Sequence, residues 1–125
     1  MTYPTYVDEC NKIMDVLDSY NRGCAQADSS IFKPFFHEQA TIFGYGPDNL
    51  VGGPISFLYE SVDNLESSGN TRAVVGRIDI VGTIANARID TNDLGGRFYT
   101  DFINLVKQGE DWIIVSKVFH SHPVD

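Results

Sequence analysis

The sequence has few of the residues that build disulfides or metal clusters. It contains two cysteines, Cys10 and Cys24, and no CxxC pair. Both fall in a segment that we expect to form one helix, where they would lie about 21 Å apart along the axis. That separation excludes a disulfide between them. We therefore expect two free thiols, which is typical of a cytoplasmic protein.

Positive charge is also scarce. Nine lysines and arginines stand against 17 aspartates and glutamates, so the net charge is -8. An acidic domain repels phosphate backbones, which argues against nucleic acid as a partner. No apolar run exceeds four residues and the start "MTYPTYVDEC" lacks a basic, apolar leader, so we expect no membrane span and no signal peptide. A phosphate-binding glycine loop and a GxSxG motif are absent as well.

The residues that are present predict one α+β domain over 1–125, because helical patterns fill the first half and strand patterns the second. A three-four spacing of apolar residues predicts a helix over about 6–27, with this stripe: Tyr6, Cys10, Ile13, Leu17, Tyr20 and Cys24. The segment "DSSIFKPFF" predicts a short second helix that Asp28 caps and Pro34 limits.

The rest of the chain predicts a curved sheet. We expect a strand over Ala40–Tyr45, a turn-rich passage "PDNLVGGP", and a third helix that starts at Gly53 and Pro54. Its apolar stripe would be Ile55, Leu58, Val62 and Leu65. Four antiparallel strands follow, joined by short turns: Ala73–Val81, Thr83–Asp90, Arg97–Lys107 and Trp112–Phe119. Twist accumulates along such strands, so the sheet should curl into a cone with a hollow.

Four segments carry a resemblance to a known superfamily: "FFHEQATIFGYG", "LVGGPISFL", "YTDFINLVK" and "GEDWIIVSKVF". With the order of elements, they resemble the nuclear transport factor 2-like (NTF2-like) superfamily. The likeness is greatest to its group labelled "putative lumazine-binding", next to SnoaL-like and ketosteroid isomerase-like proteins. The resemblance implies a cystatin-type cone, in which a curved antiparallel sheet wraps around N-terminal helices and encloses a pocket. It also implies a homodimer formed through the sheet.

A comparison with ketosteroid isomerases suggests a polar site. In those enzymes a tyrosine stands eight residues before an aspartate, as Tyr20 stands before Asp28, and a second aspartate lies in the penultimate strand, as Asp101 does. The tyrosine and the protonated second aspartate form their oxyanion hole. Their general base corresponds in position to Gly44, which has no side chain to remove a proton. This departure argues against isomerase chemistry by that mechanism.

The candidate catalytic residues are therefore Tyr20, Asp101 and His37. Tyr20 is either a plain core tyrosine or a hydrogen-bond donor in the pocket. Asp101, between two aromatic residues, is either a solvated residue, a member of a structural ion pair or a pocket acid. His37 is either a surface residue at a helix end or an acid–base group at the rim.

A second set of residues would line the pocket and bind a flat, apolar ligand. These candidates are Phe43, Tyr45, Phe57, Tyr59, Tyr99, Trp112 and Lys117. The same aromatic residues are also ordinary core residues. His120 and His122 form an H-x-H pair without a visible third ligand, so we expect no metal and no cofactor.

The register of the last hairpin decides whether Asp101 and Lys117 meet. A two-residue turn at Gly109–Glu110 places Asp101 opposite Val118 and turns Lys117 to the other face. A bulge in the turn shifts the register by one residue and puts both side chains on the same face. The sequence leaves both possibilities open.

Three functions remain open at this level. The first is binding of a small, largely apolar cyclic molecule in the pocket, and the second is an isomerase, dehydratase or cyclase that uses a Tyr/Asp oxyanion site. The third is a non-catalytic interaction module that works as a homodimer.

Overall fold

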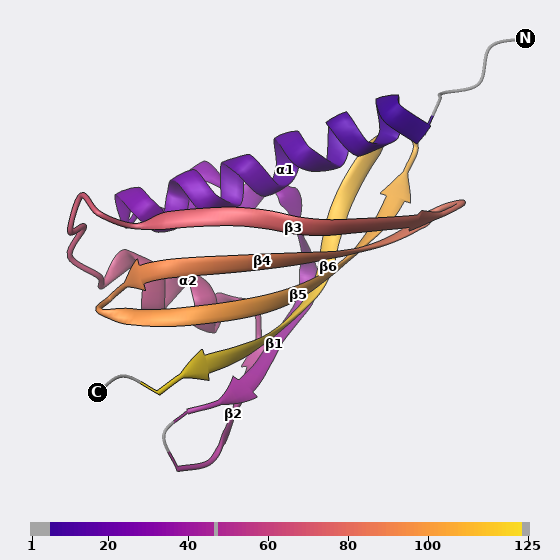
Figure 1. The fold of residues 1–125 in the computed structure, drawn as a ribbon. Helices are drawn as coiled ribbons and strands as arrows, with labels where there is room; N and C mark the ends of the chain where they lie inside the picture. Colours follow the sequence, from indigo (N-terminus) through magenta and orange to yellow (C-terminus); the bar gives the residue numbers. More distant parts are fainter. Residues whose placement is uncertain (1–5, 47, 124–125) are drawn as a thin grey trace, which may run out of the picture.

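The computed structural model describes residues 6–46 and 48–123, and the ends of the predicted domain at 1–5 and 124–125 lie outside them. Two helices and two short 3₁₀ turns pack against one six-stranded sheet (Figure 1). The elements are α1 (Tyr6–Gln26), η1 (Ser29–Ile31), η2 (Lys33–Phe35), β1 (Phe36–Tyr45), β2 (Leu50–Pro54), α2 (Ser56–Asp63), β3 (Arg72–Val81), β4 (Ile84–Leu94), β5 (Arg97–Gln108) and β6 (Asp111–His122). The predicted α+β class is confirmed.

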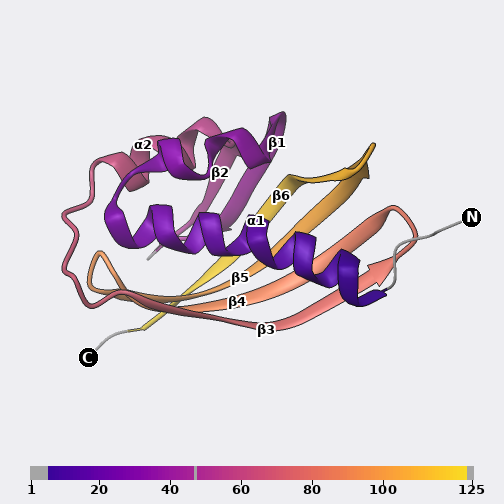
Figure 2. The same ribbon diagram turned by 90° about the horizontal axis from the view of Figure 1, so that it is seen from above.

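The sheet has the strand order β2-β1-β6-β5-β4-β3. Its neighbours are antiparallel except β1 and β6, which run parallel. Viewed from above, α1 crosses one face of the sheet, and α2 lies beside β1 and β2 (Figure 2). The curved strands and the two helices enclose the core, as the resemblance implied.

Helix α1 forms where the apolar spacing predicts it. Ile13, Leu17, Tyr20 and Cys24 of its stripe are buried, whereas Tyr6 is exposed. Tyr6 lies at the first turn and donates a hydrogen bond to the Ile78 carbonyl of β3, 3.2 Å away. The helix begins at Tyr6, so the part of the stripe near its start covers less of the core than the middle does.

The end of α1 is fixed by local chemistry. Asp28 caps η1, since its Oδ1 accepts from the Ser30 backbone N–H at 3.0 Å, as the sequence predicts. Gly23 lets Phe32 approach α1 closely, because a Cβ at this position would lie 2.3 Å from the Phe32 ring. Phe32 is therefore fully buried between α1 and the part of the sheet that contains β1.

Two boundaries predicted for the middle of the chain are wrong. Residues 50–54 form strand β2 instead of a turn and a helix start, and Pro47 of that passage lies outside the described residues. Gly52 permits this strand, because a Cβ there would lie 2.3 Å from the Ile42 carbonyl oxygen of β1. Helix α2 consequently begins only at Ser56. Strand β1 begins at Phe36, four residues before the predicted start, and its register shifts before Thr41.

Both registers that the sequence allows occur in the hairpin of β5 and β6, each in a different part of it. Near the turn, Lys107 pairs with Trp112 and Leu105 with Ile114, which is the two-residue-turn register. The register then shifts, so that Asn104 pairs with Ser116. Val115 is thus the extra residue of a β-bulge, which lies within the strand rather than in the turn.

A buried charged group anchors the start of α1 to this hairpin. Glu9 accepts hydrogen bonds from Lys107 Nζ at 2.6 Å and from Trp112 Nε1 at 2.5 Å. The Lys107 hydrogen bond, more than the Trp112 one, lowers the pKa of the Glu9 carboxyl below its usual value. Glu9 lies outside the apolar stripe of the helix, so periodicity does not identify it.

Candidate functional site

Three buried polar side chains from three elements meet between α1 and the sheet. The Tyr20 hydroxyl of α1 donates a hydrogen bond to Asp101 Oδ2 of β5 at 3.2 Å. Lys117 Nζ of β6 lies 3.6 Å from the same oxygen and 5.2 Å from the centre of the Tyr20 ring. All three residues are at most 6% exposed. We call Tyr20, Asp101 and Lys117 the polar triad.

The bulge at Val115 explains how Lys117 joins this triad. Before the bulge, Trp112 and Ile114 of β6 face the core, and after it Lys117 does. In the shifted register, Ile103 pairs with Lys117 and Asp101 with Phe119, so Asp101 and Lys117 share one face of the sheet. The structure therefore selects the alternative in which the two charges meet.

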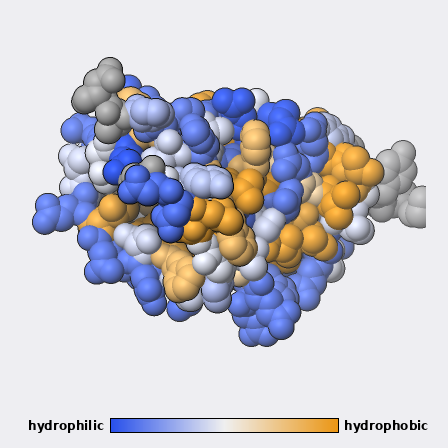
Figure 3. All heavy atoms as spheres, turned by 90° about the horizontal axis from the view of Figure 1, so that it is seen from below, coloured by the Kyte–Doolittle hydropathy of each residue, from blue (hydrophilic) through white to orange (hydrophobic). Residues whose placement is uncertain are grey.

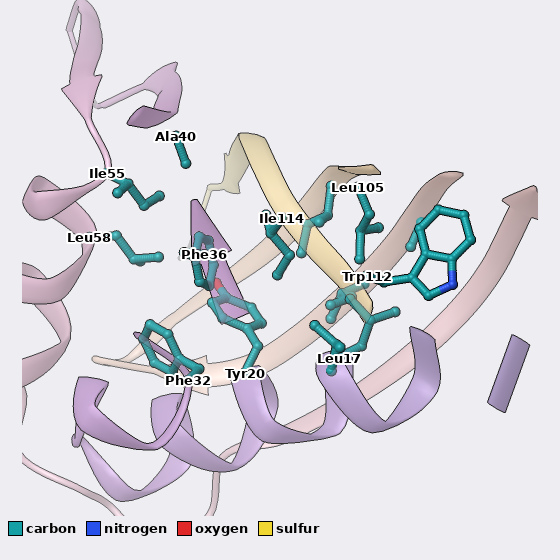
Figure 4. Close-up of a cluster of buried hydrophobic side chains, with 14 of the residues drawn as sticks. Leu17, Tyr20, Phe32, Phe36, Ala40, Ile55, Leu58, Leu105, Trp112 and Ile114 are labelled. Carbon is teal, nitrogen blue, oxygen red and sulfur yellow. The ribbon is translucent and has the colours of Figure 1, made fainter. Parts of the chain in front are cut away.

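Aromatic packing fixes the third member of the triad. The Tyr20 ring lies 5.1 Å from Phe32 and 6.0 Å from Phe36, measured between ring centres. Figure 4 shows Tyr20 extending from α1 into the layer of buried side chains, beside these two rings. Tyr20 is thus a core residue whose hydroxyl donates to Asp101, and it is not among the residues that line the neighbouring cavity.

The electrostatics of the triad differ from those of an oxyanion hole. Burial raises the pKa of the Asp101 carboxyl, and the Lys117 ammonium opposes this rise. Burial, followed by the charge of Asp101, raises the pKa of the Tyr20 hydroxyl well above its usual value. Tyr20 therefore stays a neutral donor, but it donates to Asp101 instead of pointing a free proton at a ligand. Asp101, held between a donor and a cation, is equipped to accept hydrogen bonds.

A small cavity of about 140 Å³ opens next to Asp101 and Lys117. The Asp101 Oδ1 atom is buried and has no hydrogen-bond partner among the described residues. The cavity wall is otherwise largely apolar, with these lining residues: Ile42, Leu58, Ser61, Val62, Leu65, Leu94, Tyr99, Asp101, Lys117 and Phe119. A buried polar atom without a partner is unusual in a folded protein, so a ligand that donates a hydrogen bond here would satisfy it.

A wider cleft of about 470 Å³ adjoins this cavity on the side of β2 and α2. The cavity and the cleft share three lining residues, Ile42, Ser61 and Phe119. A Cβ on Gly44 would lie 2.5 Å from the Phe119 ring, so Phe119 leaves no space for a side chain at the position that the resemblance to ketosteroid isomerases assigns to their base. The glycine and the aromatic ring are therefore a matched pair that excludes a carboxylate at this position.

The structure places only some of the predicted lining residues at the cavity. Tyr99 and Lys117 line it, and Phe57 lines the adjoining cleft. Phe43 and Tyr45 are 41% and 63% exposed. They lie on the outer face of β1, because the strand alternates and its inner positions are Ala40, Ile42 and Gly44.

Tyr59 and Trp112 also lie away from the cavity. Tyr59 packs against the rings of Phe32 and Phe36 at 6.1 Å from each, measured between ring centres. Trp112 lines an open cleft of about 770 Å³ beside the first half of α1. That cleft is larger than the cavity, but two of its charged lining residues, Lys12 and Glu110, already pair with each other at 3.4 Å. The polar triad therefore marks the better candidate site.

His37 does not join the triad. Its Nδ1 accepts a hydrogen bond from the Gln39 backbone N–H at 3.0 Å, at the start of β1. It does not line the cavity. His120 and His122 have ring centres 4.7 Å apart, and His122 Nε2 lies 2.8 Å from Thr100 Oγ1. Among the described residues, no group of three or more metal-ligating side chains occurs.

The sequence does not mark several of the cavity residues as ligand contacts. Leu58, Val62 and Leu65 were identified only as the apolar stripe of the third helix, and Ser61 was not identified at all. A helical stripe indicates burial, but it does not distinguish a packed core from a cavity wall. Within the described part of the chain, no helix is long and apolar enough to cross a membrane.

The fold and the site together define an NTF2-like α+β protein with a polar triad, of which Asp101 and Lys117 line a half-open cavity. The chain belongs to the family described as "Putative lumazine-binding", whose model matches residues 8–120. A solved NTF2-like protein of unknown function from Shewanella baltica OS155 is 48% identical, with a TM-score of 0.94 over 98% of this chain and 100% of that one.

Two further relatives extend the comparison. An NTF2-like protein of unknown function from Methylobacillus flagellatus KT is 34% identical, with a TM-score of 0.89 over 98% of this chain and 99% of that one. A fungal protein named aldolase FrzH, from a Cladobotryum species, is 31% identical over 83% of this chain and 84% of its own length.

The polar triad generates a stability prediction. Lys117→Met leaves the Asp101 carboxylate buried without its cation, and Asp101→Asn leaves Lys117 without its anion, so each should lower the free energy of unfolding by about 3–5 kcal/mol. The double variant Asp101→Asn/Lys117→Met should lose less than the sum of the two single losses. Chemical denaturation of the four proteins forms the double-mutant cycle. Lys12→Met, which changes an exposed lysine, is the control and should differ by less than about 1 kcal/mol.

The pH dependence of the free energy of unfolding gives a second test of the pair. Burial raises the pKa of Asp101 in the folded state, and Lys117→Met removes the cation that opposes the rise. A carboxyl whose folded pKa exceeds its unfolded pKa loses stability as the pH rises through the folded value. The stability deficit of Lys117→Met should therefore shrink on acidification. A deficit that is constant with pH, or additive single losses, would show that the two charges do not interact.

Proposed function

We propose that this protein binds a small, largely apolar cyclic molecule with a hydroxyl or carbonyl group in the cavity beside the polar triad. One observation carries the proposal: the Asp101 Oδ1 atom is buried, has no hydrogen-bond partner in the described part of the chain and borders a mostly apolar cavity. A ligand hydroxyl would donate to this oxygen. A ligand carbonyl would accept from the Lys117 ammonium, which lines the same cavity.

The size of the cavity limits the ligand. A dry cavity of about 150 Å³ accommodates a benzene-sized molecule, so the 140 Å³ beside the triad matches a single ring. Pockets for drug-sized ligands measure about 300–1,000 Å³. A two-ring ligand such as a lumazine would therefore have to extend past Phe119 into the adjoining cleft of about 470 Å³.

Carbonyl chemistry at the same site is the second candidate function. The relative named an aldolase supports it, since an aldol reaction proceeds through an enol or enolate formed next to a carbonyl. The Lys117 ammonium would stabilise the developing oxyanion. Asp101 would exchange the proton at the neighbouring carbon, in place of the base that Gly44 lacks. An isomerase, dehydratase or cyclase would need the same two roles.

A homodimer through the sheet is the proposed assembly for either function. The outer sheet face carries exposed apolar side chains on several neighbouring strands: Phe43, Ile84, Phe98, Phe102, Val106 and Val118. Viewed from below, on the side away from α1, apolar side chains gather among polar ones (Figure 3). Phe102 and Val118 are directly paired across β5 and β6. A second copy of this face is the proposed partner, because a self-complementary apolar patch suits a two-fold dimer.

Thermal unfolding tests the binding proposal. Cyclohexanone and cyclohexanol should raise the melting temperature more than cyclohexane does, because only the first two reach the triad through a polar atom. A ligand at about 100 times its Kd adds about 2.7 kcal/mol of stability. The effect should vanish in Asp101→Asn/Lys117→Met and persist in Tyr45→Phe, an exposed control. No stabilisation by any of these compounds or by a pterin would refute the proposal.

Hydrogen–deuterium exchange tests the catalytic candidate. Proton NMR should show that the protein accelerates exchange at the carbons next to the cyclohexanone carbonyl in D₂O. Asp101→Asn should slow the protein-dependent rate by about 10²–10⁴-fold and change KM far less, since it removes the proton acceptor. Tyr45→Phe should accelerate the exchange of cyclohexanone as much as the wild type does. Equal changes in kcat and KM for Asp101→Asn, or exchange at the buffer rate, would exclude this function.

Sedimentation velocity tests the assembly. Val118→Asp puts a charge at the centre of the outer apolar face, where Val118 is 45% exposed. This variant should be a monomer at concentrations where the wild type is a dimer. Val7→Asp makes the same change at a position on α1 that is 64% exposed, and it should leave the dimer intact. A wild type that is monomeric throughout, or a dimer that survives Val118→Asp, would contradict the proposed interface.

A further inference from the structure

The four lysines of this chain have different surroundings. Lys12 pairs with the exposed Glu110, Lys107 pairs with Glu9, and Lys33 lies over the Tyr59 ring. Lys117 alone among them lines the cavity, and its side chain is 7% exposed. A primary amine on the wall of a small apolar cavity is a functional group that structural packing alone does not require.

We propose that Lys117 is a nucleophile that forms an imine with a small aldehyde or ketone bound in the cavity. This inference rests on the proposed binding of a carbonyl compound, and it adds a covalent step and a named atom, Lys117 Nζ. The ligand class is a one-ring or smaller aldehyde or ketone, as the cavity of about 140 Å³ requires.

The geometry supplies each proton that the step needs. The Lys117 ammonium first passes a proton to the Asp101 carboxylate, whose Oδ2 lies 3.6 Å from Nζ. The neutral amine then adds to the carbonyl carbon, and the N–C bond forms as the carbonyl π bond breaks. Asp101 gives its proton to the carbonyl oxygen and takes one proton from the nitrogen, which leaves a neutral carbinolamine beside a protonated Asp101. The resulting hydroxyl leaves as water with the proton that Asp101 returns. The net change is one ammonium and one carbonyl compound converted to one iminium ion and one water.

The charges of the site are the same before and after this step. One positive charge on Lys117 nitrogen lies beside one negative charge on Asp101 both as the ammonium and as the iminium ion. No new charge is buried, so the low polarity of the cavity does not oppose the reaction. Tyr20 donates to Asp101 Oδ2, whereas Oδ1 has no partner among residues 6–46 and 48–123. Oδ1 is therefore able to accept a proton, or a hydrogen bond from the departing water.

The buried thiol near the triad is unsuitable as the nucleophile. Cys24 is buried on α1, and burial raises the pKa of its thiol to about 11. It therefore remains a thiol at neutral pH, and the thiolate is the reactive form of cysteine. Cys24 is also absent from the residues that line the cavity.

Reductive trapping tests the proposal. The protein is incubated at pH 7 with benzaldehyde near equimolar concentration and sodium cyanoborohydride, which reduces an imine to a stable benzylamine. Intact-mass spectrometry should show one added benzyl group per chain, and chymotryptic peptides should place it on Lys117. Because the site holds the aldehyde next to Nζ, Lys117 should react about tenfold or more faster than Lys12, Lys33 or Lys107.

Three variants and one ligand control make the outcome decisive. Lys117→Met should lose the rapid adduct, and Asp101→Asn/Lys117→Met repeats this test without a lone buried charge. Lys33→Met should keep it. Benzyl alcohol, which lacks a carbonyl, should compete with benzaldehyde and slow the labelling. Labelling spread over the exposed lysines, with Lys117 unmodified, would overturn the covalent step.

Thermal shifts separate this result from a failure of the binding proposal. If benzaldehyde and benzyl alcohol both raise the melting temperature while Lys117 stays unlabelled, the covalent step is wrong and the binding proposal stands. If neither compound raises the melting temperature and no rapid adduct forms, both are wrong.

Discussion

The bulge at Val115 is the feature on which the candidate site depends. It shifts β6 by one residue relative to β5, so that Lys117 enters the interior on the same face as Asp101. Without this shift, Asp101 would remain buried on β5 with its charge unpaired, which is strongly destabilising. The bulge therefore pairs the two buried charges and also sets which side chains line the cavity.

Helix α1 is attached to the β5–β6 hairpin by two groups of buried polar contacts. Glu9 bonds to Lys107 and Trp112 near the start of the helix. The Tyr20 hydroxyl bonds to Asp101 about three turns further along, where Lys117 completes the triad. These contacts need specific partners, unlike the apolar contacts of Ile13 and Leu17. They therefore fix how the helix lies along the sheet, and the cavity is what remains between the second group and α2.

The same cone can support different chemistry because small changes alter the inner wall. In this chain, the Phe119 ring packs against Gly44, the position to which the resemblance to ketosteroid isomerases assigns their base. Lys117 beside Asp101 favours a carboxylate, whereas an oxyanion hole needs a protonated acid that donates. At the cavity, the triad consequently presents the Asp101 carboxylate as an acceptor and the Lys117 nitrogen as a cation. Membership of a fold superfamily predicts the scaffold, and the side chains at the cavity decide what the scaffold binds.

Local signals in the sequence were sufficient for α1, the Asp28 cap and the antiparallel strands β3 to β6, because spacing, capping and short turns act between near neighbours in the chain. The candidates Tyr20 and Asp101 came instead from the resemblance to ketosteroid isomerases, and Lys117 was named as a residue that lines the pocket. Strand β2 was missed because "LVGGP" resembles a turn locally, and only the close approach of Gly52 to β1 makes it a strand. Glu9 and the cavity were missed for a related reason, since their contacts join residues far apart in the sequence. The meeting of Asp101 and Lys117 was likewise decided by tertiary structure, because the register of two long strands depends on the summed packing of both faces and not on the residues of the turn.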